Sequence, residues 1–121
     1  MTALAIPESS RSAVKAREGM RCLRCGSPRG AEWHHRRSRR VRDAHQHCPC
    51  VGVWLCVTCH RWAHTNPREA RAEGFIVSQY ESEPWTVPVR AHFGMLLMNC
   101  KGTYTYCKSQ GSDPLNTGEG R

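Results

Sequence analysis

The chain has 121 residues, a formal net charge of +8 and a hydrophobic fraction of 39%. This length accommodates one domain and excludes two of ordinary size, and no uninterrupted apolar run approaches the length of a membrane span. Arginine supplies 15 of the 18 basic residues. Because the guanidinium fork pairs with phosphate oxygens, this excess favours a nucleic-acid partner. An Arg-rich composition without such a role is the alternative, but the arginines are also clustered.

The first ten residues, MTALAIPESS, lack the basic region and the long apolar region of an export signal. We therefore expect a cytoplasmic protein, in the host cell if the gene belongs to a phage, with no membrane partner. In that reducing compartment paired cysteines bind metal more often than they form disulfides. The segment SSRSAVKAREG can form a short helix that starts at Ser9 or Ser10 and stops at Gly19. Nothing apolar on this helix demands burial, so we expect residues 1–20 to form a flexible arm.

Residues 21–78 carry the patterns of a compact domain. Asn66 and Pro67 suit the N-cap and N1 positions of a short helix, and Gly74 suits its C′ position. The expected elements, in chain order, are a knuckle at 22–26, a strand at 31–35, a loop at 36–50, a strand at 51–55, a knuckle at 56–60, a helix at 60–66 and a short helix at 67–74.

The C-terminal third has mixed patterns. FIVSQY at 75–80 is typical of a buried strand, whereas prolines confine the following segment, EPWTVPV, to an edge or a loop. GMLLMNCKGTYTYC predicts a hairpin that turns at Lys101 and Gly102. We expect residues 79–107 to form a β extension, which either packs on the core or forms a partner surface, and residues 108–121 to be a disordered tail.

Two identical cysteine spacings are the strongest local signal. Cys22 and Cys25 form one CxxC pair, and Cys56 and Cys59 form another. Two such pairs complete a tetrahedral, four-thiolate structural zinc site. Zinc binding by such peptides contributes about 10 to 16 kcal/mol at neutral pH, which is ample for a core this small. Four reduced core cysteines are the alternative.

The remaining cysteines permit other interpretations. Cys48 and Cys50, in the motif CPC, lie near the second knuckle in the sequence and could replace one of its ligands. We expect Cys100 and Cys107 to be strand residues that behave as small hydrophobes rather than as ligands.

The histidines form a second candidate metal group. His60 and His64 are four residues apart on the expected helix, so they share one face and can chelate one ion. Such a pair alone more often consists of two surface histidines that bind no metal. Here the knuckles tie the helix to the strand that carries His34 and His35, which places four histidines in one region. We expect the other three to be solvated or to face a substrate: His45, His47 and His92.

The order CxxC … HH … LCxxCHxxxH, from Cys22 to about Val77, resembles the HNH nuclease family in its zinc-knuckle-containing phage and bacterial form. The resemblance implies a small α+β fold, a zinc-stapled ββα-metal core with a C-terminal β-hairpin extension and disordered termini. It also implies metal-dependent hydrolysis of phosphodiester bonds in DNA, with 5′-phosphate and 3′-hydroxyl products. Action beside a phage terminase or another DNA-processing protein is a further implication.

The resemblance also assigns roles by position. His35 resembles the general base, and Glu32 resembles an acidic residue that supports the site in some members. Val51 stands where the family has the asparagine of its name, so Gln46 or His47 would have to replace the missing amide. The residues that resemble ligands of a catalytic Mg²⁺, Mn²⁺, Ni²⁺ or Zn²⁺ ion are His34, His60 and His64.

A dense run of positive charge follows the histidine pair. It would draw the DNA backbone onto the metal, with salt-dependent and largely sequence-independent binding; a solvated basic loop is the alternative. These predicted DNA-binding residues are Arg36, Arg37, Arg39, Arg40 and Arg42. We expect Trp33, Trp54 and Trp62 to pack the core rather than to stack on bases.

Two other functions remain compatible with the sequence. One is a catalytically weak or inactive zinc-dependent DNA-binding module of the same fold, which Val51 favours. The other is a zinc-bound interaction domain for RNA or protein. An exchangeable divalent ion beside a tight zinc ion would distinguish the nuclease from both.

Overall fold

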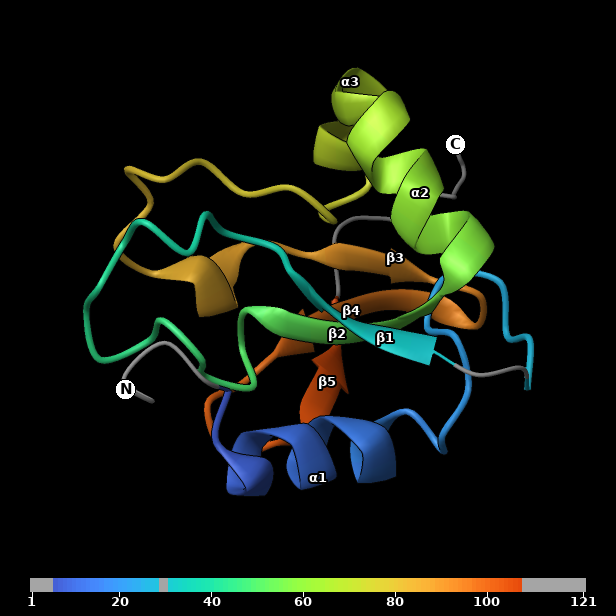
Figure 1. Ribbon diagram of the computed structural model, residues 1–121, viewed down its shortest axis with the longest axis horizontal. Coiled ribbons are helices and arrows are strands. Elements are labelled where there is room, and N and C mark those ends of the chain that lie inside the picture. The colour runs from blue at the N-terminus through green and yellow to red at the C-terminus, as the bar shows by residue number, and fades with distance from the viewer. Residues whose placement is uncertain (1–5, 29–30, 108–121) are drawn as a thin grey trace.

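The computed structural model of the protein describes residues 6–28 and 31–107, so the expected tail at 108–121 lies outside the described residues. The described chain forms a small α+β fold with two antiparallel sheets (Figure 1). Its elements are α1 (Glu8–Arg17), β1 (Ala31–His35), β2 (Gly52–Cys56), α2 (Val57–Thr65), α3 (Pro67–Ala72), the 3₁₀ turn η2 (Pro84–Thr86), β3 (Val89–Ala91), β4 (Gly94–Met98) and β5 (Tyr104–Tyr106). Within this part of the chain, no helix has the length and apolar character that a bilayer span requires.

The β1–β2 hairpin is the centre of the fold and confirms both strands expected there. Trp33 pairs with Trp54, and His35 pairs with Gly52. A Cβ atom at Gly52 would lie 2.1 Å from the Trp33 ring, so only glycine allows this ring to cross β2. Because side chains alternate along a strand, Trp33 and His35 share one face of the hairpin, and Glu32 and His34 share the other.

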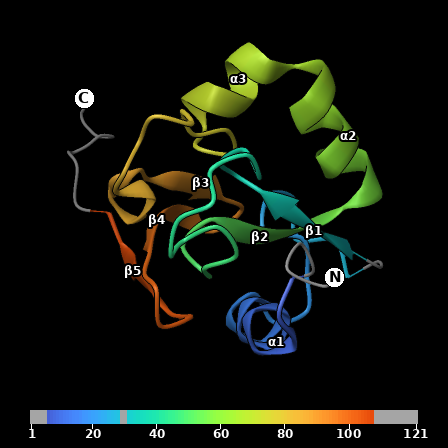
Figure 2. The same cartoon turned by 60° about the vertical axis from the view of Figure 1, so that its left-hand side comes forward.

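The hairpin lies between α1 on one side and α2 with α3 on the other, as the two views agree (Figures 1 and 2). The expectation that residues 1–20 form a flexible arm is therefore wrong for residues 6–20, which the structure describes. Val14 of α1 is fully buried and packs with Trp33 and Trp54. This single apolar side chain was too weak a signal, because the partner tryptophans are distant in sequence.

Polar side chains complete the docking of α1. The Arg17 guanidinium donates to the carbonyl oxygens of Pro49 and Gly52, each at 2.7 Å. Glu18 accepts a 2.6 Å hydrogen bond from the Trp54 backbone N–H and pairs with Arg17 at 2.5 Å. These contacts bury charged groups, which sequence patterning assigns to the surface.

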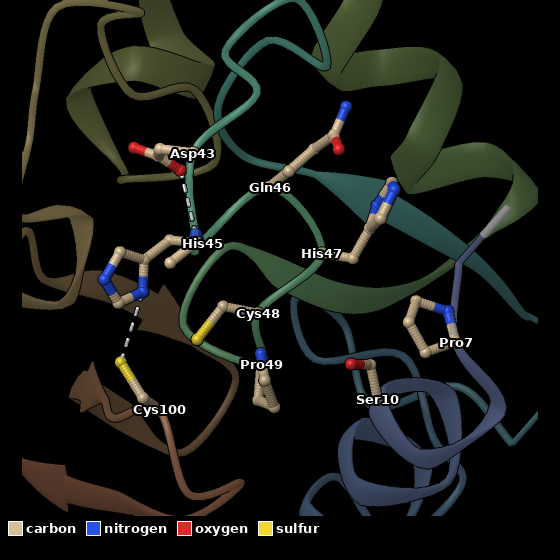
Figure 3. Close-up of a pocket in the computed structure, with 10 residues that line it drawn as sticks. Pro7, Ser10, Asp43, His45, Gln46, His47, Cys48, Pro49 and Cys100 are labelled. Carbon is tan, nitrogen blue, oxygen red and sulfur yellow. Dashed lines mark hydrogen bonds between the residues drawn. The ribbon is translucent and has the colours of Figure 1, made fainter. Parts of the chain in front are cut away.

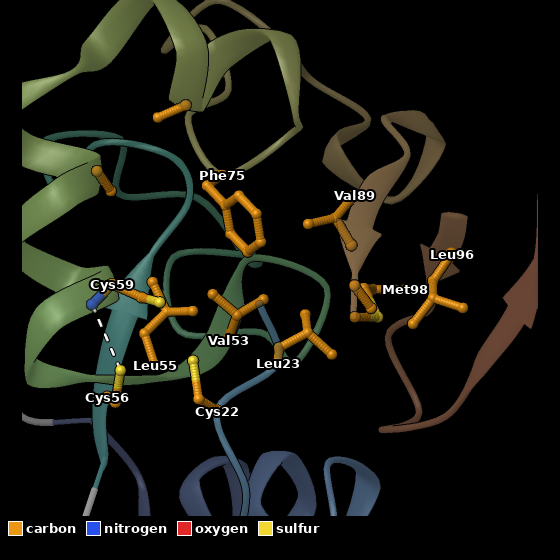
Figure 4. Close-up of a cluster of buried hydrophobic side chains, with 13 residues drawn as sticks. Cys22, Leu23, Val53, Leu55, Cys56, Cys59, Phe75, Val89, Leu96 and Met98 are labelled. Atoms are coloured by element: carbon orange, nitrogen blue, oxygen red, sulfur yellow. Dashed lines mark hydrogen bonds between the residues drawn. The ribbon is translucent and has the colours of Figure 1, made fainter. Parts of the chain in front are cut away.

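The C-terminal segment forms a second sheet in the order β3-β4-β5 and shares its core with the hairpin. Figure 4 shows three side chains that meet in this core: Val53 of β2, Val89 of β3, and Phe75 from the segment after α3. The extension therefore packs on the core, which was one of the two expectations. The hairpin expected at 94–107 is confirmed, with Met98 opposite Tyr104.

One expected strand is absent. Residues 75–80 form turns and bends, and the only ladder contact there among the described residues is an isolated bridge between Arg37 and Val77. The helix ends nearby are confirmed: Pro67 occupies the first turn of α3, and Gly74 has a positive φ of 86° after its C-cap.

Candidate metal centres and active site

The two knuckles bring their cysteines together. The four sulfur atoms lie within 4.8 Å of one another, and Cys25 Sγ is 3.8 Å from Cys56 Sγ. A tetrahedral zinc ion with Zn–S bonds of about 2.3 Å has sulfur–sulfur edges of about 3.8 Å. The Cys25 N–H donates to Cys22 Sγ at 3.5 Å, and the Cys59 N–H donates to Cys56 Sγ at 3.4 Å. This donor set fits a metal ion such as zinc.

The surroundings of this group suit its charge, because zinc with four thiolates carries a net negative charge. The Arg24 guanidinium donates to Cys59 Sγ at 3.7 Å and lies 3.5 Å from the centre of the Trp62 ring. Arg24 also pairs with Glu73 at 3.4 Å. Trp62 packs against the main core, as expected for a structural rather than a base-stacking tryptophan.

The histidines of β1 and α2 form a second group. One ring nitrogen each of His34, His60 and His64 lies within 4.8 Å of the others. The rings of His60 and His64 are 4.9 Å apart between centres, as their spacing on one helix face predicts. The ring of His34, on β1, lies 5.1 Å from that of His60 and 5.7 Å from that of His64. Strand and helix are held together by the neighbouring knuckles, because Cys59 immediately precedes His60.

Hydrogen bonds orient two of these rings. A carbonyl only accepts, so His34 Nε2 donates to the Phe75 carbonyl at 2.6 Å and leaves the Nδ1 lone pair for a metal. His60 Nδ1 is 2.6 Å from Glu32 Oε1, which leaves His60 Nε2 available. Carbonyl and carboxylate partners of this kind are typical of metal-bound histidines. Burial lowers the pKa of His34 to about 4, so its ring is neutral, as ligation requires.

His35 does not join this group. Its Nε2 lies 3.1 Å from His47 Nδ1, on the other side of the strand from His34. Nevertheless His34, His35 and His64 line one pocket of about 420 Å³. Burial, followed by the positive charge of Arg39, lowers the pKa of His35 to about 4, so its imidazole is neutral throughout the physiological range.

A buried side chain occupies the position at which the resemblance would require an asparagine. Val51 is fully buried and offers no polar side-chain group. Of the two possible substitutes, Gln46 donates to the Arg39 carbonyl at 2.8 Å and so holds the loop. His47, which we expected to be solvated or to face a substrate, is half-buried and makes the contact with His35 instead.

Two of the five arginines assigned to DNA are buried, so that assignment is wrong for them. Arg36 is 1% exposed and Arg37 is 2% exposed. Arg37 donates to the Glu81 carbonyl and to Asp43. Arg36 donates to three carbonyl oxygens, those of Gly74, Cys50 and Val87. A run of arginines in a loop is typical of an exposed basic patch. The side chains of these two instead bind the loop to segments that are distant in the sequence.

The other three assigned arginines are exposed: Arg39, Arg40 and Arg42. A basic residue that the sequence did not single out, Arg71 of α3, lines the same pocket as His34 and His35. No local motif marks Arg71, because only the folding of α3 over the hairpin brings it there.

Cys48 and Cys50 do not contribute to the four-cysteine group. They lie instead with His45 and Cys100, and the four donor atoms are within 4.8 Å of one another. The expectation of a strand position for Cys100 is wrong, since Cys100 occupies the exposed turn between β4 and β5. His45, which we expected to be solvated or to face a substrate, is half-buried beside these cysteines. The motif CPC with a nearby histidine was the available signal.

The described residues thus contain three groups of cysteines and histidines that can hold a metal ion such as zinc. Two members of the three-histidine group, His34 and His64, line a pocket whose wall also carries His35. No protein-family model matches the chain, and no curated protein or solved structure matches it.

Proposed function

We propose that this protein is a metal-dependent DNA endonuclease that hydrolyses phosphodiester bonds, with a zinc-stapled ββα-metal core similar to that of HNH nucleases. The observation that carries the proposal is a three-histidine group of which two members, His34 and His64, line one pocket together with His35. Three protein ligands leave positions for phosphate and water, as a catalytic metal site requires. A purely structural site would use four ligands and would be closed.

The three histidines would hold the ion, and Glu32 and the Phe75 carbonyl would keep two of their rings oriented. A divalent ion bound there supplies Lewis acidity toward a phosphoryl oxygen and stabilises negative charge on the leaving oxygen. Imidazole ligands suit zinc and nickel better than manganese or magnesium, so the donor set favours the softer ions.

His35 is the proposed general base. If its Nε2–H donates to His47 Nδ1, its Nδ1 lone pair is free to accept a proton from water. The resulting hydroxide attacks phosphorus in line with the departing 3′-oxygen. A pKa of about 4 keeps the imidazole unprotonated, at some cost in basicity. His47 acts here as a positioning residue, in the role that the resemblance gives to asparagine.

The charge distribution supports a DNA substrate. Arg39, Arg40 and Arg42 are exposed on the loop that directly follows β1, and Arg71 lines the pocket itself. Guanidinium groups so placed can pair with phosphates on either side of the scissile bond. Such contacts specify position rather than sequence, and they weaken steeply with salt.

A zinc-dependent DNA-binding module without catalysis is the second candidate, and Val51 is the observation that favours it. This candidate keeps the knuckles and the exposed arginines. It differs only in the inability of the pocket to activate water.

Cleavage of supercoiled plasmid by the purified protein tests the proposal. We would titrate Mg²⁺, Mn²⁺, Ni²⁺ and Zn²⁺, with an EDTA lane, and compare wild type with His35→Ala and with His92→Ala, a matched control at an exposed histidine outside the pocket. We expect metal-dependent cutting that His35→Ala abolishes and His92→Ala retains, with DNA binding preserved in both.

Circular dichroism of each sample separates loss of catalysis from loss of the fold. Equal cutting by His35→Ala and wild type would remove the base assignment. A folded protein that shifts DNA but cuts with no ion would favour the binding module, and Val51→Asn would then test whether one amide restores activity.

A further inference from the structure

Three segments that are distant in sequence converge on a second cysteine-rich group. His45, Cys48 and Cys50 belong to the irregular loop between β1 and β2, and Cys100 belongs to the turn between β4 and β5. Figure 3 shows His45, Cys48 and Cys100 facing one another at the edge of a surface pocket. Cys50 is fully buried beneath them, whereas Cys100 is exposed.

The distances within this group fit a tetrahedral metal ion. His45 Nδ1 lies 3.6 Å from Cys100 Sγ and 4.0 Å from Cys50 Sγ. Zinc bonds of about 2.3 Å to sulfur and about 2.0 Å to nitrogen imply sulfur–nitrogen edges of about 3.6 Å. All four donor atoms lie within 4.8 Å of one another. A tetrahedral set of three sulfurs and one nitrogen is typical of zinc.

A buried cation beside the group needs negative charge. Arg36 is 1% exposed, and its three hydrogen bonds all go to main-chain carbonyl oxygens, one of them that of Cys50. Buried charges in proteins are usually paired with an opposite charge. Zinc with three thiolates and one imidazole carries a net negative charge, which would supply the counter-charge that the carbonyl dipoles only partly provide.

We propose that these four side chains bind a second structural zinc ion, separate from the four-cysteine site. Four protein ligands close the coordination sphere, so the ion has a structural rather than a catalytic role. The ion joins the β1–β2 loop to the C-terminal sheet. Residues 84–107 thereby gain a structural role, because this segment supplies Cys100 and also Trp85, whose ring lies 4.8 Å from that of His45.

The site also bears on catalysis, and this step rests on the proposed function. His47 lies between two of the ligands in sequence, and it contacts His35. The loop has no helix or strand to fix it, so the ion would hold His47 against the proposed base. Residues that support a site in this way typically change its activity by about 10- to 100-fold.

Cobalt titration of the reduced, metal-free full-length protein tests the second site. Thiolate-to-cobalt charge-transfer absorption reports only sulfur-ligated ions, so the three-histidine group does not contribute to it. We expect this absorption to rise until two equivalents are bound in wild type and one in Cys100→Ser. The amplitude should fall by roughly three-sevenths, because three of seven thiolates leave the signal. Zinc should displace the cobalt in both proteins.

Cys107→Ser is the matched control, since Cys107 lies on the same hairpin outside the group and should leave two equivalents. Cys100 is exposed, so its replacement preserves packing; should that variant still fail to fold, the wild-type titration decides by itself. Saturation of wild type at one equivalent would overturn the proposal, as would a disulfide among these cysteines that persists in the folded protein under reductant. The readout is cobalt–thiolate absorption and not cleavage, so the two proposals can fail separately. A protein that binds one thiolate-ligated ion but cuts DNA would contradict only the second zinc site. A protein that binds two such ions but does not cut DNA would contradict only the nuclease proposal.

Discussion

Replacement of Arg36 by alanine tests whether this arginine stabilises the fold or binds DNA. The side chain is 1% exposed and donates to the carbonyls of Gly74, Cys50 and Val87 at 2.6 to 2.8 Å. These carbonyls belong to three different segments of the chain. Burial lowers the pKa of Arg36 to about 10, which leaves the guanidinium charged at neutral pH.

The expected loss of stability follows from the groups left behind. Each buried carbonyl without a partner costs about 1 to 3 kcal/mol, and three of them would cost about 3 to 9 kcal/mol. Water entering the space vacated by the side chain would recover part of this, so we expect a loss of about 3 to 5 kcal/mol. A domain of this size is stable by about 5 to 15 kcal/mol, so the variant should be severely destabilised.

Urea unfolding, followed by tryptophan fluorescence at saturating zinc, measures this loss. The control is Arg40→Ala, because Arg40 is exposed on the same loop. We expect Arg40→Ala to change the free energy of unfolding by less than about 0.5 kcal/mol and to weaken DNA binding in a salt-dependent way. An Arg36→Ala protein as stable as wild type, but with reduced affinity for DNA, would refute the structural role.

Four other changes test the metal groups, the base and the docking of α1. Cys25→Ala should lose the first zinc ion and unfold, because about 10 to 16 kcal/mol of binding energy exceeds the stability of most small domains; a well-folded variant without that ion in a thermal melt would contradict this. Glu32→Ala should weaken Mn²⁺ or Ni²⁺ binding at the histidines about 10- to 100-fold in calorimetry, and unchanged affinity would argue against its orienting role. His47→Ala should lower the cleavage rate by about 10- to 100-fold with DNA binding unchanged, and His47→Asn, which can also accept from His35, should restore part of it. Burial raises the pKa of Glu18 to about 7. The free energy of unfolding of wild type, relative to that of Glu18→Gln, should therefore be greatest below pH 4.5 and should fall as the pH rises through 7. If this relative stability instead grew with pH, the Arg17 ion pair would be keeping the carboxylate charged.

The elements that short-range patterns specify were predicted from the sequence. The strands at β1 and β2, the helix after the second knuckle and the caps of α3 depend on alternation, spacing and the conformational limits of proline and glycine. Each CxxC pair is equally local, so the four-cysteine group could be predicted before any fold was known. The spacing of His60 and His64 placed them on one helix face for the same reason.

Contacts between distant segments were decided by the tertiary structure. Arg36 and Arg37 belong to a run of charge that looks solvated, and only the segments that fold over them bury their guanidinium groups. His45 and Cys100 are 55 residues apart, and nothing in either neighbourhood indicates the other. Sequence by itself thus determined which residues can bind metal and which local elements carry them. The packing of the C-terminal sheet against the loop decided which donors meet, because donor atoms form a site only when the chain brings them within a few ångströms.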